Sequence, residues 1–384
     1  MKDTVLLLIG PGDVTGTHFT SCLHFSSEFR NRGFKTEIIR VRTKKSLRVL
    51  YERLSKGDIY CVHVEQGQLL GVHLNNKQNI FDYFDVPVCS QIRDHWFYPW
   101  LFPHLLKMPE KSILVHCDTT SDGITKHLKG IHMQGSTTAQ YARDFLPKEL
   151  RKESKPVFVG TIRDPEKIQS MIIEKYPKSR ALIESLLDSL SFSAQIPEWF
   201  WEINYENDFV FFNKFQDPVE RELYFDLFTL ARFTVRSSFA NTLSQLDCRI
   251  YGKGDWNPPK KYKAEIDLSG VTKLAAQNLA ADATIILSDQ AGLRNGLGER
   301  VAAGVLDSKP ILMRDSSFSR AYINQISGLM SFSNHEEIPG KLQEIVMTEV
   351  NDRDAIDKSR TVIPREILPI SYVDQALEHI RDYS

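Results

Sequence analysis

The sequence of 384 residues has few cysteines and no long apolar run. Its five cysteines include no C-x-x-C pair, so neither the spacing of a zinc site nor that of a disulfide framework is present. No segment reaches the roughly 18 apolar residues that a membrane-spanning helix needs, and the apolar run at the N-terminus is too short for a signal peptide. We therefore expect a protein of a reducing, cytoplasmic compartment.

An excess of charge of either sign is also absent. The 48 Lys and Arg residues are balanced by 49 Asp and Glu residues, which leaves a formal net charge of −1. This balance disfavours a nucleic-acid binder that works by bulk electrostatics, although it leaves room for a local basic pocket. The composition, 42% apolar and 25% charged, is that of a globular protein. Because the chain is longer than one ordinary core supports, we expect two domains.

The first 120 residues alternate between predicted strands and helices. Thr4 to Ile9 is apolar without alternation, which is typical of a central parallel strand covered on both faces. A loop containing glycine, a helical stretch ending near Gly33 and a second strand, "FKTEIIRV", complete a βαβ unit. The pattern repeats with the strands "DIYCVHV" and "SILVHCD". Residues 1–150 are therefore predicted to form a doubly wound, Rossmann-like domain.

A charged stretch, "LPKELRKESKP", indicates a linker, after which the alternation starts again with the strand "PVFVGTI". The short strands "CRIYG", "ATIILSD" and "KPILMRD" follow, and the region 165–245 is predicted to be mostly helical. We expect a second Rossmann-like domain over 151–360 and a C-terminal helix within 361–384 that packs back across both domains. The predicted fold class is α/β, with two doubly wound sheets.

The sequence lacks the usual signatures of several ligand sites. The stretch "GPGDVTGTH" has no Lys in the position that a Walker A loop requires, and it misses the dinucleotide fingerprint G-x-G-x-x-G by one position. A nicotinamide-dependent oxidoreductase stays open as an alternative. The eleven histidines form no H-x-x-x-H or H-E-x-x-H arrangement, so we expect no metal site and no bound cofactor.

The stretch "NGLGERVAAGVLDSKPIL" places glycines before a predicted helix from Glu299 to Leu306. Gly296 and Gly298 would let the backbone approach a ligand closely, and Arg300 would lie in the first turn, beside free N–H groups and the positive end of the helix dipole. Anions bind at such helix starts, and a guanidinium grips phosphate through two hydrogen bonds. The alternative for Arg300 is a surface ion pair with Glu299.

Two further cations follow predicted strands of the second domain. Lys253 lies between two glycines in "YGKGDW", where it either meets an anion or belongs to a simple turn. Arg163 in "GTIRDP" either contacts phosphates or pairs with Asp164. Trp256 is interpreted as a packing residue rather than as a cover over a nucleotide base.

The first domain has a candidate general base. His18 opens the first predicted helix, and an imidazole has an ordinary pKa of about 6.5, so it could take a proton from a hydroxyl near neutral pH. Asp13 precedes it, and Asp118 in "HCDTTSDG" follows another strand, where it could orient His18 or bind hydroxyls. Capping of helices is the alternative role for these residues.

Four stretches of the second half carry a resemblance to a known family. They are, in order, "VFVGTIRDP", "LDCRIYGKGDW", "VTKLAAQNLAADATIILSD" and "RNGLGERVAAGVLDSKPILMRDSSF". This succession, over about 150–320, resembles the donor-binding half of GT-B glycosyltransferases, and most closely the spore-maturation-type and group 1 families.

The resemblance implies two Rossmann-like domains facing each other across a cleft and transfer of a hexosyl or related group. The second domain would bind a UDP-sugar or another nucleotide-diphosphate sugar, and the first would bind the acceptor. That acceptor could be a glycan, protein, lipid, nucleobase or small metabolite. Besides the residues above, the resemblance places Tyr251, Gly252, Gly254 and Asn295 at the donor.

A metal-independent enzyme of this kind needs backbone N–H groups, a helix dipole and a cation to neutralise the leaving diphosphate. The sequence departs from the family at Ala303, where an acidic residue usually grips the ribose hydroxyls. A non-catalytic nucleotide- or carbohydrate-binding protein of the same fold is therefore the alternative.

Overall fold

The computed structural model divides the chain into two compact units. The first comprises Met1–Tyr141 together with Arg365–Ser384, and the second comprises Ala142–Pro364. The structure describes residues 2–11, 17–74, 78–92, 98, 100–116, 128–134, 155–190, 196, 200, 216–270, 283–290, 301, 304, 309–326, 328–351 and 369–383.

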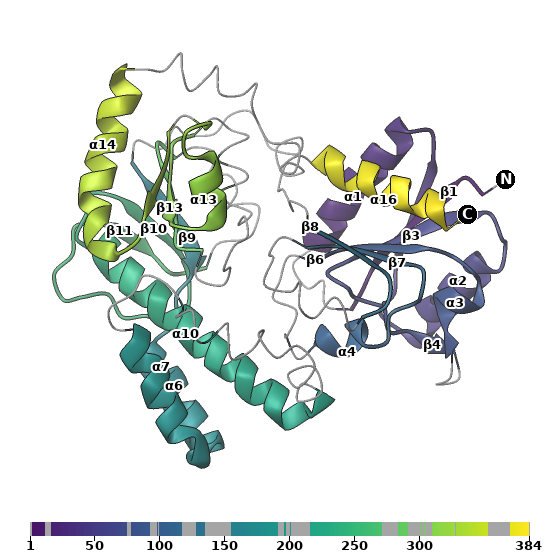
Figure 1. The fold of residues 1–384 in the computed structure, drawn as a ribbon, viewed down its shortest axis with the longest axis horizontal. Helices are drawn as coiled ribbons and strands as arrows, with labels where there is room; N and C mark the ends of the chain where they lie inside the picture. Colours follow the sequence, from purple (N-terminus) through teal and green to yellow (C-terminus); the bar gives the residue numbers. More distant parts are fainter. Residues whose placement is uncertain are drawn as a thin grey trace. The chain divides into compact units, whose positions relative to one another are not determined.

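The first unit is built on a six-stranded parallel sheet in the order β2-β1-β3-β6-β7-β8 (Figure 1). All six residues of β1 are buried because strands flank it and helices cover it, as its apolar run predicts. A short antiparallel pair, β4 with β5, lies outside this sheet. The strands are β1 (Thr4–Ile9), β2 (Lys35–Arg40), β3 (Ile59–Glu65), β4 (His73–Leu74), β5 (Gln78–Asn79), β6 (Val88–Ile92), β7 (Ser112–His116) and β8 (Ile131–Gln134).

One face of this sheet is covered by the first and the last described helices, α1 and α16. Phe25 and Phe29 of α1 and Tyr372 and Val373 of α16 pack with strand residues in one buried apolar cluster. Figure 1 shows the two helices side by side. The C-terminal helix is thus part of the core of the first unit. The helices of this unit are α1 (Thr17–Asn31), α2 (Lys44–Leu54), α3 (Ile80–Tyr83), α4 (Phe102–Leu105) and α16 (Pro369–Asp382).

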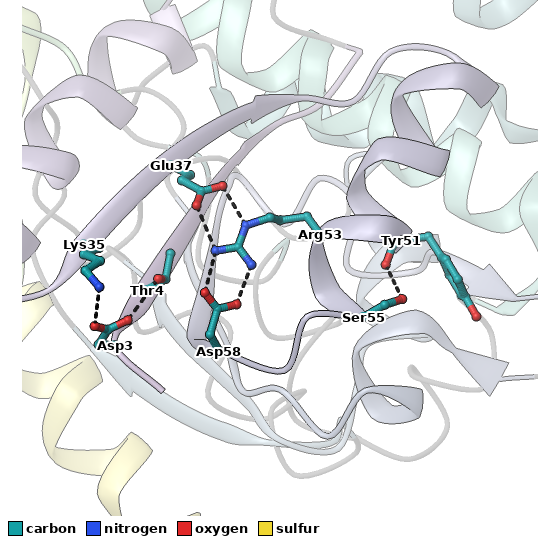
Figure 2. Close-up of polar contacts among 8 residues, drawn as sticks. All are labelled: Asp3, Thr4, Lys35, Glu37, Tyr51, Arg53, Ser55 and Asp58. Carbon is teal, nitrogen blue, oxygen red and sulfur yellow. Dashed lines mark hydrogen bonds and ion pairs between the residues drawn. The ribbon is translucent and has the colours of Figure 1, made fainter. Parts of the chain in front are cut away.

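Helix α2 is fixed at both ends by side-chain hydrogen bonds. At its start, Thr43 and Ser46 form a capping box that satisfies backbone N–H groups. In its last turn, Arg53 donates to Glu37 on β2 and to Asp58 before β3, at distances of 2.5–3.0 Å (Figure 2). The hydrogen bonds from Arg53 lower the pKa of both carboxyls. One guanidinium therefore joins a helix, an edge strand and a loop.

The second unit repeats the plan with a parallel sheet in the order β11-β10-β9-β12-β13-β14. Its core is one buried cluster that includes Phe158, Phe239 and Phe332, and the ring planes of the last two are stacked. The strands are β9 (Val157–Thr161), β10 (Arg249–Lys253), β11 (Glu265–Asp267), β12 (Ile286–Ser288), β13 (Ile311–Arg314) and β14 (Leu329–Phe332).

The helices of the second unit begin with capping residues that the sequence shows. Asp164 caps α6 and Asp217 caps α10, and in both helices a proline follows at the first helical position. Helix α10 is the longest described helix, with 27 residues, and it contacts α6, α7 and β10. The helices are α6 (Pro165–Lys175), η3 (Pro177–Ser179), α7 (Arg180–Leu190), α10 (Pro218–Ser244), α13 (Ser317–Tyr322), η4 (His335–Glu337) and α14 (Ile338–Asn351).

None of the described helices combines the length and the apolar character that crossing a membrane requires.

Candidate active site

The two parallel sheets determine where a ligand site belongs in each unit. In open α/β sheets, ligands bind beyond the carboxyl ends of the strands, because the connecting loops and the helix N-termini meet there. In the second unit this edge is formed by the residues that follow β9, β10, β12 and β13. Several sequence-predicted site residues lie on it, and one buried ion pair that the sequence did not predict supports it.

The ion pair joins Arg236 in the middle of α10 to Asp289, which follows β12. Two nitrogen–oxygen distances of 2.5 and 3.0 Å show a bidentate arrangement, and both side chains are at least 94% buried. A third guanidinium nitrogen donates to the backbone carbonyl of Thr161 at the end of β9, at 3.3 Å. Arg236 therefore connects α10 with the ends of two neighbouring strands, and its own charge is neutralised by Asp289.

Arg163 lies two residues after β9 and does not form an ion pair with its neighbour Asp164. Instead, Asp164 caps α6 by accepting a hydrogen bond from the backbone N–H of Glu166 at 3.0 Å. The Arg163 guanidinium lies over the ring of Phe233 on α10, 5.8 Å from its centroid. Arg163 is half-buried and lies near the carboxyl end of the sheet.

The glycines around Lys253 have a structural role that the sequence did not reveal. A Cβ atom on Gly252 would collide with the carbonyl oxygen of Gly160, and one on Gly254 would collide with that of Ile162. Gly254 also has a φ of +134°, a conformation that side chains rarely allow. The two glycines let β10 approach β9 closely, which places the exposed Lys253 beside the residues that follow β9.

Two other predicted residues near this edge are placed by the structure. Tyr251 is half-buried within β10. Trp256 packs in the core of the second unit, 5% exposed, and donates through its indole nitrogen to Asn241 at 3.1 Å. Its interpretation as a packing residue is therefore confirmed.

The predicted helix from Glu299 to Leu306 is described at only two positions. Val301 and Gly304 are helical and buried. A Cβ atom on Gly304 would lie 2.8 Å from the side chain of Ile311 and 2.9 Å from that of Ile286, so this helix packs closely on β12 and β13. The predicted phosphate-binding residues lie outside the described residues: Asn295, Gly296, Gly298, Glu299 and Arg300.

In the first unit, His18 is the second residue of α1 and is half-buried. Because α1 follows β1, this residue lies beyond the carboxyl end of a central strand, as predicted. Asp13 and Asp118 lie outside the described residues. The assignment of His18 as a general base therefore stays a prediction.

A buried polar network that the sequence did not predict lies beneath α16. The Nδ1 atom of His63 lies 2.6 Å from the hydroxyl oxygen of Tyr372, and its Nε2 atom lies 3.4 Å from a carboxylate oxygen of Glu65. Burial lowers the pKa of His63, but hydrogen bonds with Cys89 and Glu65 outweigh burial and raise it to about 9. The signal for this network was the pair His63 and Glu65, which lie two residues apart and so share one face of β3.

A second missed feature is the turn that follows β3. Gln66, Gly67 and Leu69 have positive φ angles of 55°, 64° and 70°. This conformation is common for glycine, but for other residues it costs about 1–3 kcal/mol each and persists only where the surroundings impose it. Residues in such conformations cluster at functional sites, so the turn marks the carboxyl end of β3 as a candidate site.

Gln68, inside the same turn, lies against the end of the neighbouring strand β1. A Cβ atom on Gly10 would collide with the Gln68 side-chain oxygen. That oxygen is buried and has no hydrogen-bond partner among the residues that the structure describes. Leaving a buried polar group unsatisfied costs about 1–3 kcal/mol, so the arrangement calls for an explanation.

The described residues include no group of three or more His, Cys, Asp or Glu side chains that could hold a metal ion. One segment of the sequence, Asp352-Arg353-Asp354, has the Asp-x-Asp spacing that metal-dependent transferases of another fold use. It lies outside the described residues. Metal independence therefore stays a prediction.

Comparison with solved structures identifies the architecture. The chain is similar to AviGT4, a glycosyltransferase involved in avilamycin A biosynthesis, with a TM-score of 0.50 and 11% identity over 99% of this chain and 97% of that chain. The fold is GT-B. This likeness spans both units, and the two parallel sheets match the predicted fold class. At this identity the similarity establishes the fold alone.

Weaker likenesses connect the chain to two further enzymes. A UDP-forming α,α-trehalose-phosphate synthase from Burkholderia xenovorans matches with a TM-score of 0.40 and 11% identity, over 100% of this chain and 99% of that one. The trehalose-6-phosphate synthase OtsA matches with a TM-score of 0.39 and 10% identity, over 95% and 82%. No family model matches the sequence, and no curated protein is similar to it.

Proposed function

We propose that the protein is a glycosyltransferase that moves a sugar from a nucleotide-diphosphate sugar to an acceptor hydroxyl or another nucleophile. The observation that carries the proposal is the pair of six-stranded parallel sheets, together with a likeness to a glycosyltransferase along almost the whole of both chains. A GT-B fold provides two strand edges, one for each substrate, which suits the transfer of a group between two different molecules.

The donor is assigned to the second unit. Lys253 ends β10, Arg163 lies two residues after the neighbouring strand β9, and the Arg236–Asp289 pair holds α10 against the same edge. Lys253 forms no ion pair within the described part of the chain, so its charge remains available for a phosphate. In this proposal Gly296, Gly298 and Arg300 bind the diphosphate, and Tyr251, Gly252, Gly254, Asn295 and Glu299 complete the donor site.

The chemistry needs the leaving diphosphate to be stabilised as the glycosidic bond breaks. Backbone N–H groups at the start of the helix near Glu299, the guanidinium of Arg300 and the ammonium of Lys253 would supply this stabilisation without a metal. If the configuration at the sugar inverts, His18 takes the proton from the acceptor, helped by Asp13 or Asp118. If the configuration is retained, His18 binds the acceptor instead.

A donor panel tests the proposal. Release of nucleoside diphosphate is measured from UDP-, GDP-, ADP- and dTDP-sugars, with and without EDTA. We expect release from at least one donor, undiminished by EDTA, and a fall in kcat/KM of about 10²–10³-fold for Arg300→Ala, because a charge-stabilising donor is lost. The matched control is Arg320→Ala, which removes an exposed arginine that pairs with Asp315 in the same unit.

The outcomes separate the competing functions. If no donor yields nucleoside diphosphate but one still binds, the protein is the non-catalytic binding alternative. If neither release nor binding occurs, the proposal is wrong. If EDTA abolishes release, the transferase assignment stands and metal independence is wrong. Quenching of reduced-nicotinamide fluorescence on mixing would instead support an oxidoreductase.

A further inference from the structure

The turn after β3 is held in its left-handed conformation by hydrogen bonds to β6 and by a close contact with an apolar side chain. The Gln66 N–H donates to the Gln91 carbonyl, and the Gly67 N–H donates to the Ser90 hydroxyl, both at 2.9 Å. A Cβ atom on Gly67 would lie 2.6 Å from the side chain of Leu101. The turn is therefore tied to β6 and packed against the apolar core, which is what a strained segment requires in order to persist.

This rigid turn presents the side chain of Gln68 at the junction of two strand ends. The strands β1 and β3 are neighbours in the sheet, Gly10 directly follows β1, and the Gln68 amide lies against Gly10. Any residue with a side chain at position 10 would displace the amide. The glycine therefore keeps space for Gln68 at the carboxyl edge, where ligands of this sheet class bind.

The Gln68 amide has hydrogen-bonding capacity that the folded chain leaves unused. Within the described part of the chain, its buried oxygen has no hydrogen-bond partner. Gln68 as a whole is only half-buried, so rotation about its terminal torsion can turn the amide toward solvent.

We propose that Gln68 binds a hydroxyl group of a neutral, sugar-like acceptor at the edge of the first unit. The inference rests on the proposed glycosyltransferase function. A side-chain amide both accepts and donates hydrogen bonds, and a hydroxyl group does the same, so the two groups can pair with each other. Residues 65–70 contain one glutamate and two glutamines but no cation, and Gln91 pairs with Glu65 across the strands. Gln68 is the one residue of 65–70 that is not buried, so the group offered to a ligand there is an uncharged amide, which suits an uncharged polyol better than a phosphorylated or acidic acceptor.

The test compares Gln68→Leu with a matched control, Gln375→Leu. Gln375 lies on α16 of the same unit and also has a buried side-chain oxygen without a partner, but it is remote in sequence from the turn. Binding of the methyl glycosides of glucose, galactose and mannose is measured by saturation-transfer NMR, with UDP present. Thermal unfolding and UDP binding are recorded on the same samples.

We expect at least one glycoside to bind the wild type and Gln68→Leu to weaken that binding at least tenfold. Gln375→Leu should bind within twofold of the wild type, and the Tm of Gln68→Leu should be unchanged or higher, because an unsatisfied buried group is removed. Absence of glycoside binding, equal binding by Gln68→Leu, or a marked loss of its thermal stability would each overturn the inference.

Measurements on the same samples distinguish failure of the Gln68 acceptor site from failure of the proposed glycosyltransferase function. If UDP or another nucleoside diphosphate binds while no glycoside does, the donor assignment survives and the Gln68 site is wrong. If a glycoside binds through Gln68 but no nucleoside diphosphate binds, the site is a sugar site and the transferase assignment fails.

Discussion

The imidazole of His63 and the hydroxyl of Tyr372 form a buried hydrogen bond of 2.6 Å between β3 and α16. Both side chains are fully buried, and Phe25 of α1 contacts the rings of both, with centroid distances of 4.5 and 5.0 Å. The last described helix is therefore fastened to the sheet by a specific polar contact as well as by apolar packing. This arrangement makes α16 as much a part of the first unit as α1.

Replacing Tyr372 with Phe should destabilise the first unit by about 1–3 kcal/mol, because the His63 nitrogen loses a buried partner. The free energy of unfolding in urea, followed by a probe in the first unit, measures the loss. Tyr262→Phe is the control, since Tyr262 is 53% exposed in the second unit. An unchanged urea midpoint in Tyr372→Phe would show that the hydrogen bond contributes nothing to stability.

The stability of the first unit should fall at alkaline pH. The pKa of His63 is raised to about 9 in the folded protein, whereas an unfolded histidine titrates near 6.5. Its stabilising contribution is therefore complete below about pH 6.5 and is lost as the pH rises through about 9. Cys89, Glu65 and Tyr372 face the imidazole and take part in this titration. Between pH 6 and 10, the Tm of the wild type should fall more steeply with rising pH than the Tm of His63→Gln. Parallel plots of Tm against pH would contradict the expectation.

Breaking the Arg236–Asp289 pair should destabilise the second unit strongly. Either Arg236→Met or Asp289→Leu leaves a buried charge without its partner, which costs about 3–5 kcal/mol. The double variant removes both charges and should recover much of that loss, so a double-mutant cycle gives a large coupling energy. Arg320→Ala, which breaks an exposed pair, should cost no more than about 1 kcal/mol. Additive effects in the cycle would show that the two residues act independently.

Glycines of the second unit should differ sharply in their tolerance of alanine. Gly252→Ala and Gly254→Ala place a Cβ atom against backbone carbonyls, which cannot move without disturbing β9, so both should lower the Tm and weaken donor binding. Gly340→Ala on α14 meets nothing within 4 Å and should stabilise the helix by about 0.5–1 kcal/mol. Calorimetry of the three variants checks the order. Tolerance of alanine at position 252 would refute the close approach of the strands.

Local patterns predicted most of the fold. The apolar run Thr4–Ile9 forms the buried strand β1, and the apolar strand segments and glycine-containing loops along the chain predicted the alternation of two doubly wound sheets. The predicted fold class is confirmed. These features follow from neighbours in sequence, for which hydrophobic period and capping chemistry are sufficient signals.

The supporting contacts of the candidate site were not predictable in the same way. Arg236 and Asp289 are 53 residues apart, and His63 and Tyr372 are 309 residues apart, so only the three-dimensional packing brings them together. The roles of Gly252 and Gly254 were interpreted as ligand contacts because strand proximity has no one-dimensional signature. The left-handed backbone at Gln66 and Leu69 is likewise imposed by tertiary contacts against local preference.

The placement of α16 also affects the order in which the chain can mature on the ribosome. The second unit is one uninterrupted stretch and can become complete while the end of the chain is still being synthesised. The first unit begins earlier but must wait, with one face of its sheet partly uncovered, until the helix that carries Tyr372 has emerged. The unit that contains β1 is therefore completed after the unit that begins at Ala142, and nascent chains stalled before residue 369 should be the ones that need a chaperone.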